Sequence, residues 1–143
     1  MLEAVQLSLG TERDAARERL AALWNELHED DAFHRCVVAH YLADLQSDPQ
    51  DELAWDRLAL AAALSASAEA FNGRIPGVEH ATFLPSLHLN LAASLERVGE
   101  LGSAKLQASA ALAGIDALGS TPLANLTRSA VLRLCERLGI NNG

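Results

Sequence analysis

The residues best suited to chemistry are two histidines and a cysteine in one short stretch, His34, Cys36 and His40. Cys36 and His40 are four residues apart, so a helix would place them on one face, where a thiolate and an imidazole could bind a metal ion. His88, Asp44 or His28 would have to complete the site. A metal-dependent enzyme that uses Cys36, His40 and His88 is therefore an alternative hypothesis, while the simpler interpretation of Cys36 is a small buried side chain.

No other arrangement of residues predicts catalysis. Gly99 and Gly102 flank an expected turn between helices, whereas a phosphate-binding glycine loop follows a strand. Ser86 and His88 are two residues apart, and a helix would point their side chains away from each other. The sequence therefore predicts a protein that is not an enzyme and that uses no cofactor.

The elements that must position these residues are expected to be helices. The chain has 143 residues, half of them apolar, and alanine and leucine dominate while strand-favouring residues are rare. This length is typical of one domain, and it is enough to bury roughly two-thirds of the unfolded surface. We expect an all-α fold of about six helices.

The formal net charge is −8, which argues against a nucleic-acid partner. The charge is unevenly distributed: residues 1–72 carry 14 acidic and 5 basic residues, and residues 73–143 carry 5 and 6. A solvated acidic face explains this asymmetry most simply. An acidic end that recruits a basic partner is the alternative.

The sequence also predicts where the protein acts. Residues 1–10 include Glu3 and lack the apolar core of a secretory signal. The longest apolar run, Leu58 to Leu64, is too short to span a bilayer. Cys36 and Cys135 lie far apart without a paired motif, as expected for reduced, buried thiols. We therefore expect a cytoplasmic protein with no membrane partner.

The most regular stretch predicts a helical hairpin over residues 83–118. Apolar residues recur at steps of three and four on both sides of Gly99, whose freedom to adopt a left-handed conformation suits a helix end. Gly119 is expected to end the second helix. A linker this short forces two helices to lie antiparallel as neighbours. The stripes consist of Leu84, Leu87, Leu91, Leu95 and Val98, and of Leu101, Ala104, Ala108, Ala111, Leu112 and Ile115.

This hairpin resembles a tetratricopeptide repeat, over about one repeat length of roughly 34 residues. In that family a leucine and a small residue precede a large apolar residue, a glycine marks the turn, and small residues line the second helix. The positions that match are Leu91, Ala92, Leu95, Gly99, Ala104, Ala111 and Leu112. Two positions depart from the pattern, because Ala108 replaces an aromatic residue and Asp116 replaces the closing proline.

The rest of the chain is interpreted as variations on the same unit within a single domain, 1–143. A helix from Glu12 to about His28, capped by Thr11, precedes a divergent repeat at 31–64. The helices of this repeat are expected at Ala32 to about Gln46 and from Asp48-Pro49 to as far as Phe71. An insertion follows at 65–82, either an extended helix with a surface loop or a loop that gates a groove. A capping helix at 121–139 starts at Thr121-Pro122 and ends at Gly139.

The resemblance implies a concave groove lined by the first helices of successive repeats. Carried over position by position, it implies that eight residues face a bound peptide: Phe33, Val37, His40, Asp44, Ser86, Leu89, Asn90 and Arg97. Asn90 and Arg97 could fix a peptide backbone or carboxylate, although Asn90 could equally bond within its own helix. Arg97 also suits the helix dipole, which we favour for that residue.

We therefore predict a non-enzymatic module that binds a peptide or helix of an unidentified protein partner in this groove. A structural module that forms a homodimer through its exposed repeat ends is a second hypothesis, beside the metal-dependent enzyme.

Overall fold

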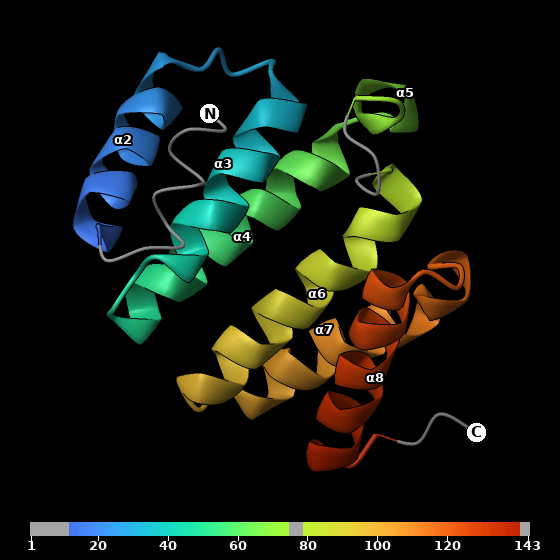
Figure 1. Ribbon diagram of the computed structural model, residues 1–143. Coiled ribbons are helices and arrows are strands. Elements are labelled where there is room, and N and C mark those ends of the chain that lie inside the picture. The colour runs from blue at the N-terminus through green and yellow to red at the C-terminus, as the bar shows by residue number, and fades with distance from the viewer. Residues whose placement is uncertain (1–11, 75–78, 141–143) are drawn as a thin grey trace. The chain divides into compact units, whose positions relative to one another are not determined.

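The computed structural model describes residues 12–74 and 79–140 of the chain. Within these ranges the protein consists of seven α-helices and one short 3₁₀ helix, with no strand (Figure 1). The predicted all-α fold is confirmed. Contacts divide the chain into two compact units, residues 1–66 and 67–143, and each unit is described here by itself.

Between residues 12 and 66, the first unit contains three helices, α2 (Arg13–Glu26), α3 (Ala32–Asp44) and α4 (Pro49–Ser65). The side chain of Asp48 accepts a hydrogen bond from the backbone N–H of Gln50, and Pro49 occupies the first turn of α4, as the sequence predicts. The expected cap Thr11 lies outside the described residues, and α2 follows Glu12 as its N-cap residue.

Three predicted helix ends in the first unit are too late in the chain, beginning with α2, which ends at Glu26 and not near His28. Helix α3 ends at Asp44 and not near Gln46, whose side-chain amide instead donates to the Leu42 carbonyl at 2.9 Å. Helix α4 ends at Ser65 and does not continue to Phe71. The chain is extended at Ala66 and Ser67, and the Ser67 hydroxyl accepts from the N–H of Ala70 to start a new, four-residue helix.

Helix α3 packs on both α4 and α2, and one core cluster of the first unit forms where α2 meets α3. Its fully buried members come from the apolar stripes of these helices and from the residue after α3: Ala16, Leu20, Val38, Leu42 and Leu45. Trp24, Tyr41 and Trp55 pack around this cluster while staying partly exposed. The Arg13 guanidinium donates to the Asp44 carbonyl at 2.8 Å, so the start of α2 is fixed to the end of α3.

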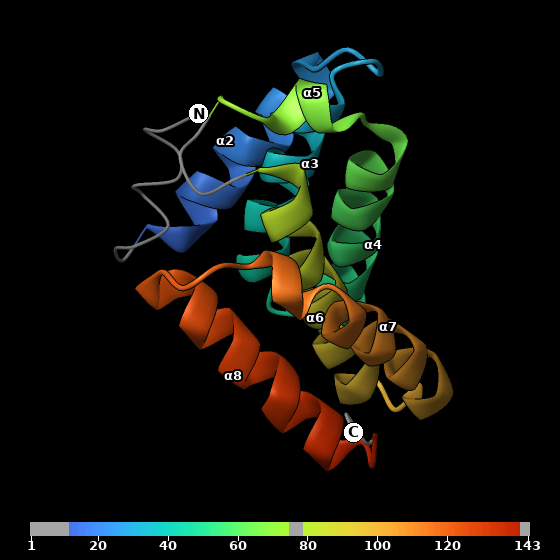
Figure 2. The same cartoon turned by 90° about the vertical axis from the view of Figure 1, so that its right-hand side faces the viewer.

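The second unit contains α5 (Ala68–Phe71), α6 (His80–Arg97), α7 (Leu101–Ala113), the 3₁₀ helix η1 (Ile115–Ala117) and α8 (Pro122–Arg137). Helix α5 and the start of α6 lie inside the predicted insertion at 65–82. Helix α7 ends at Ala113, earlier than the predicted end at Gly119. After α7 the chain passes through η1 and returns as α8 (Figure 2).

Two helices of the second unit end in the same way. Gly99 and Gly139 have φ angles of 86° and 74°, which a residue with a side chain rarely adopts. After α6, the N–H of Glu100 donates to the Leu95 carbonyl at 2.9 Å. After α8, the N–H of Ile140 donates to the Cys135 carbonyl at 2.8 Å. These bonds are those of a Schellman motif, and the predicted glycine ends at Gly99 and Gly139 are confirmed.

Helix α8 packs on both α6 and α7. Arg137 near its end forms an ion pair with Glu96 near the end of α6, at 3.1 Å. The buried Cys135 thiol donates to the Ala108 carbonyl of α7 at 3.7 Å. A hairpin followed by a third helix that contacts both of its members is therefore the architecture of this unit.

None of the helices in the described part of the chain combines the length and the apolar character that crossing a membrane requires.

Candidate functional site

Four of the predicted groove residues lie on α3, at successive turns of one helical face. Phe33 and Val37 are buried, with 3% and 4% of their surfaces exposed, while His40 is half-buried and Asp44 is exposed. Spacings of four, three and four residues keep these side chains in register along the helix. This face therefore changes from apolar to charged toward the C-terminal end of α3.

The other four predicted residues lie on α6. Ser86, Leu89 and Asn90 are half-buried and Arg97 is exposed. The Ser86 hydroxyl donates to the Phe83 carbonyl at 2.7 Å within the same helix, so it is already bonded locally. Asn90 and Arg97 are seven residues apart, or two turns, which places an amide and a guanidinium on the same side of α6.

The predicted site thus divides into two sets, one in each compact unit. The set on α3 offers an imidazole and a carboxylate beside apolar side chains. The set on α6 offers an amide and a guanidinium. Such groups can form hydrogen bonds and ion pairs with a bound molecule.

The His40 imidazole contacts the ring of Tyr41, and its pKa is shifted by its surroundings. Its ring lies 5.3 Å from the Tyr41 ring, centroid to centroid. Burial lowers the pKa of His40 below its ordinary value of 6.5, and the nearby Asp44 carboxylate opposes that shift. The imidazole is therefore neutral near pH 7, and it acts there as a hydrogen-bonding and packing group.

The geometry gives no support to a metal site at Cys36, His40 and His88. Cys36 is fully buried, and burial raises the pKa of its thiol from 9.0 to about 12, so the thiolate that metals bind is disfavoured. His88 lies in the other unit, where its Nδ1 is 2.8 Å from Gln107 Oε1 and joins α6 to α7. Among the described residues, no group of three histidine, cysteine or acidic side chains could hold a metal ion.

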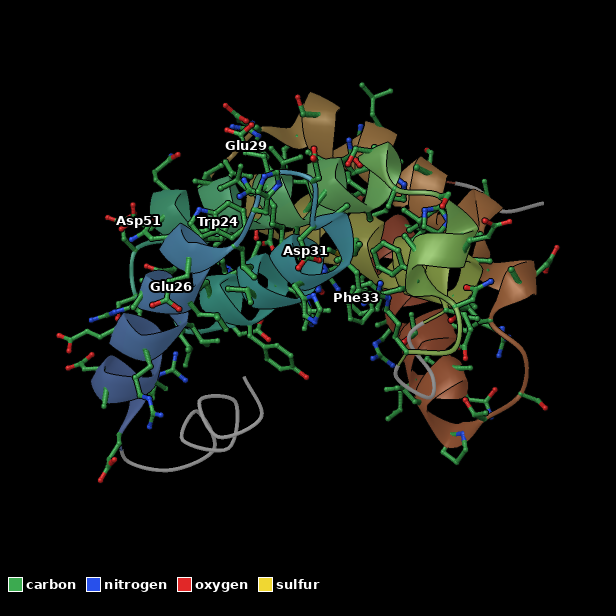
Figure 3. The ribbon with its side chains drawn as sticks, turned by 90° about the horizontal axis from the view of Figure 1, so that it is seen from above. Trp24, Glu26, Glu29, Asp31, Phe33 and Asp51 are labelled. Carbon is green, nitrogen blue, oxygen red and sulfur yellow. The ribbon has the colours of Figure 1, made fainter. Side chains whose placement is uncertain are left out.

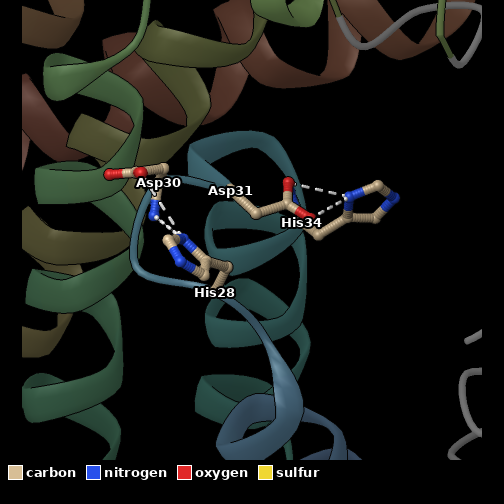
Figure 4. Close-up of polar contacts among 4 residues, drawn as sticks. All are labelled: His28, Asp30, Asp31 and His34. Carbon is tan, nitrogen blue, oxygen red and sulfur yellow. Dashed lines mark hydrogen bonds and ion pairs between the residues drawn. The ribbon is translucent and has the colours of Figure 1, made fainter.

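Two histidines pair with acidic residues around the connection between α2 and α3 (Figure 4). The Asp31 carboxylate caps α3 by accepting from the backbone N–H of His34, and the His34 ring nitrogen Nδ1 lies 2.9 Å from both carboxylate oxygens. His28 Nδ1 accepts from the N–H of Asp30 at 3.2 Å. Sequence reasoning missed the Asp31–His34 pair, although an acidic residue three positions before a histidine at a helix start is its signal.

An aromatic and cationic cluster joins the three helices of the first unit. The rings of Trp24 and Trp55 meet edge to face at 5.1 Å, and the Arg35 guanidinium lies 4.0 Å from the centre of the Trp24 ring. This contact gives both tryptophans a packing role between helices. Trp24 is labelled in Figure 3, together with Glu26 of α2, Glu29 and Asp31 between α2 and α3, and Asp51 of α4. The sequence alone does not reveal the contact of Arg35 with Trp24, because the two residues lie on different helices and helical spacing relates only residues of one helix.

Buried polar groups give no sign of a missing ligand. In the described part of the chain, every buried side-chain nitrogen or oxygen atom has a hydrogen-bond partner. Comparison of the chain with protein-family models, with curated proteins and with solved structures finds no match. Function therefore has to be argued from the helices themselves.

Proposed function

We propose that the chain is a non-enzymatic, tetratricopeptide-like interaction module that binds a peptide or helix of a partner protein, with α6 of the second unit as a binding helix. The observation that carries the proposal is the arrangement of the second unit, in which α8 packs on both members of the α6–α7 hairpin. Helical repeats stack in this way, and each further repeat extends a surface along its first helices. Helix α6 is such a first helix.

The repeated helix ends support this interpretation. Residues 95–100 and 135–140 share a glutamate, an arginine and a left-handed glycine at equivalent positions, and both form the same pair of backbone hydrogen bonds. Helix α8 therefore corresponds to α6, one repeat later. The ion pair between Arg137 and Glu96 joins equivalent ends of the two helices.

The chemistry of the proposed surface suits a peptide. Asn90 carries both a donor and an acceptor, which matches a peptide bond, and Arg97 can bind a carboxylate. Asp44 is exposed and can pair with a basic side chain. The two cysteines are unpaired and buried, which fits a reducing compartment, so we propose that the module acts in the cytoplasm.

A random peptide library displayed on phage and selected against the full chain tests this function. Selected peptides would be synthesised, and their affinity for the chain measured by calorimetry. We expect the double variant Asn90→Ala/Arg97→Ala to bind them at least about tenfold more weakly, since two polar contacts are lost. Circular dichroism would show that the variant remains folded.

A matched control lies on α7, where Lys105 and Ser109 are both exposed. The double variant Lys105→Ala/Ser109→Ala removes a cation and a polar group from another helix of the same unit, and it should bind like the wild type. Equal binding by the wild type and a folded Asn90/Arg97 variant would contradict the proposed role of α6. The variant His40→Ala/Asp44→Ala gives the same test for α3.

A further inference from the structure

Leucines are exposed on α4, α7 and α8 in the described part of the chain, and on α4 and α8 they line up with other apolar residues. On α4, Leu58 and Leu64 are 41% and 60% exposed, and on α8 Leu123 and Leu126 are 66% and 67% exposed. Ala54 and Ala61 extend the exposed apolar strip on α4, at steps of four and three from Leu58. Apolar side chains that line up on a helix face in this way mark an interaction surface more often than single exposed leucines do.

Each strip has a charged residue at one end, and the two charges are opposite. Asp51 lies seven residues before Leu58 on α4, and Arg133 lies seven residues after Leu126 on α8. Seven residues are two helical turns, so in each helix the charge lies on the same face as the leucine and about 10 Å from it. Asp51 and Arg133 are both exposed, and neither forms an ion pair within residues 12–74 and 79–140.

We propose that α4 of one copy of this chain packs antiparallel on α8 of a second copy. When two helices pack antiparallel, the residue numbers of each facing pair add up to the same sum. One register brings four residues of α4 opposite four residues of α8. It places Asp51 opposite Arg133, Ala54 opposite Ala130, Leu58 opposite Leu126 and Ala61 opposite Leu123. Two small residues facing each other at Ala54 and Ala130 let the helix axes approach closely.

A second copy of the chain is the occupant because each copy carries both complementary surfaces, with a carboxylate at Asp51 on α4 and a guanidinium at Arg133 on α8. Residues 1–66 contain 13 acidic and 5 basic residues, whereas residues 67–143 contain 6 of each, so the contact joins the acidic unit of one copy to a unit without net charge. A dimer with a twofold axis contains this contact twice, since each copy supplies both surfaces.

Sedimentation equilibrium of the full chain over a range of concentrations tests this dimer. The wild type should self-associate, and Leu126→Glu should weaken the association at least about tenfold, because it buries a charge opposite Leu58. Leu106→Glu is the matched control: Leu106 is 74% exposed on α7 and lies outside both strips, so its variant should associate like the wild type. A wild type that stays monomeric at every concentration overturns the proposal.

Charge reversal tests the register. Asp51→Arg and Arg133→Asp should each lower dimer formation by themselves, because each places like charges opposite one another in both contacts. Mixing the two variants should restore the dimer, since both contacts then pair opposite charges. If mixing leaves both variants as monomers, or if neither variant affects the dimer, the proposed register is wrong. Peptide binding plays no part in either experiment.

Discussion

The two compact units hold their helix connections with different chemistry. In the first unit, carboxylates cap the starts of α3 and α4: Asp31 accepts from His34, and Asp48 accepts from Gln50. In the second unit, the hydroxyls of Ser67 and Thr121 cap α5 and α8. Left-handed glycines end α6 and α8 there, at positions where backbone geometry alone satisfies the last carbonyls.

The unit with carboxylate caps is also the unit that carries the negative charge of the chain. The first 66 residues carry the whole net charge of −8, and the remaining 77 residues are balanced. Carboxylate caps add to the negative charge, whereas hydroxyls and glycines add nothing. The stability of the first unit should therefore depend on charge and pH, and that of the second unit on backbone geometry and packing.

The largest effect should come from removing core leucines. Leu42 in the first unit and Leu95 in the second are both buried, and their replacement by alanine should each cost about 2–5 kcal/mol of stability. Hydrogen exchange followed by mass spectrometry should show lost protection mainly in the unit that carries the change. Leu106→Ala removes an exposed leucine and should cost less than about 0.5 kcal/mol. If either core variant lowered hydrogen-exchange protection equally in both units, the two units would not have separate cores.

The next largest effects should come from glycine substitutions in the second unit. A β-carbon on Gly114 would lie 2.9 Å from Cγ of Pro85, so Gly114→Ala should overpack this contact between α6 and the residue after α7 and cost about 1–3 kcal/mol. Gly102 lies in α7 with open space around it, and Gly102→Ala should instead stabilise the protein by up to about 1 kcal/mol. Urea denaturation measures both changes. A stabilising Gly114→Ala would show that the contact adjusts without cost.

Removal of a helix-capping side chain should change the stability less than the core and glycine substitutions do. Asp31→Ala and Thr121→Ala each leave the N–H at a helix start without its side-chain acceptor, at a cost of about 0.5–2 kcal/mol. Added salt should reduce the cost at Asp31 and leave the cost at Thr121 unchanged, because only the first cap is charged. Asp31→Asn keeps the acceptor and provides the control. The contrast between the units fails if salt affects both caps equally.

The smallest effect should be a pH dependence from His40. Its pKa is lowered in the folded state, so between the ordinary value of 6.5 and the folded value the unfolded chain binds more protons. Stability should therefore be complete above pH 6.5 and should fall as the pH drops below it. His40→Gln should flatten this part of the curve, as measured by urea denaturation at a series of pH values. An unchanged slope would show that another group is responsible.

Most helices, several of their starts and two of their ends followed from the sequence because they depend on local chemistry. Asp48-Pro49 and Thr121-Pro122 predicted two starts, and Gly99 and Gly139 predicted two ends, since a cap needs only residues within one turn. Where the prediction failed, the apolar pattern continued past the helix. Ala66 and Ser67 break the run toward Phe71, because the Ser67 hydroxyl starts α5 instead.

Only the tertiary structure determined which side chains meet. The sequence grouped Cys36 and His40 with His88, yet the fold buries Cys36, places His88 in the other unit and pairs its ring with Gln107. It also brings Arg35 onto Trp24 and Arg137 onto Glu96 from separate helices. Helical periodicity fixes the face on which a residue lies. The residue opposite it depends on how the helices pack, and no short-range pattern encodes that.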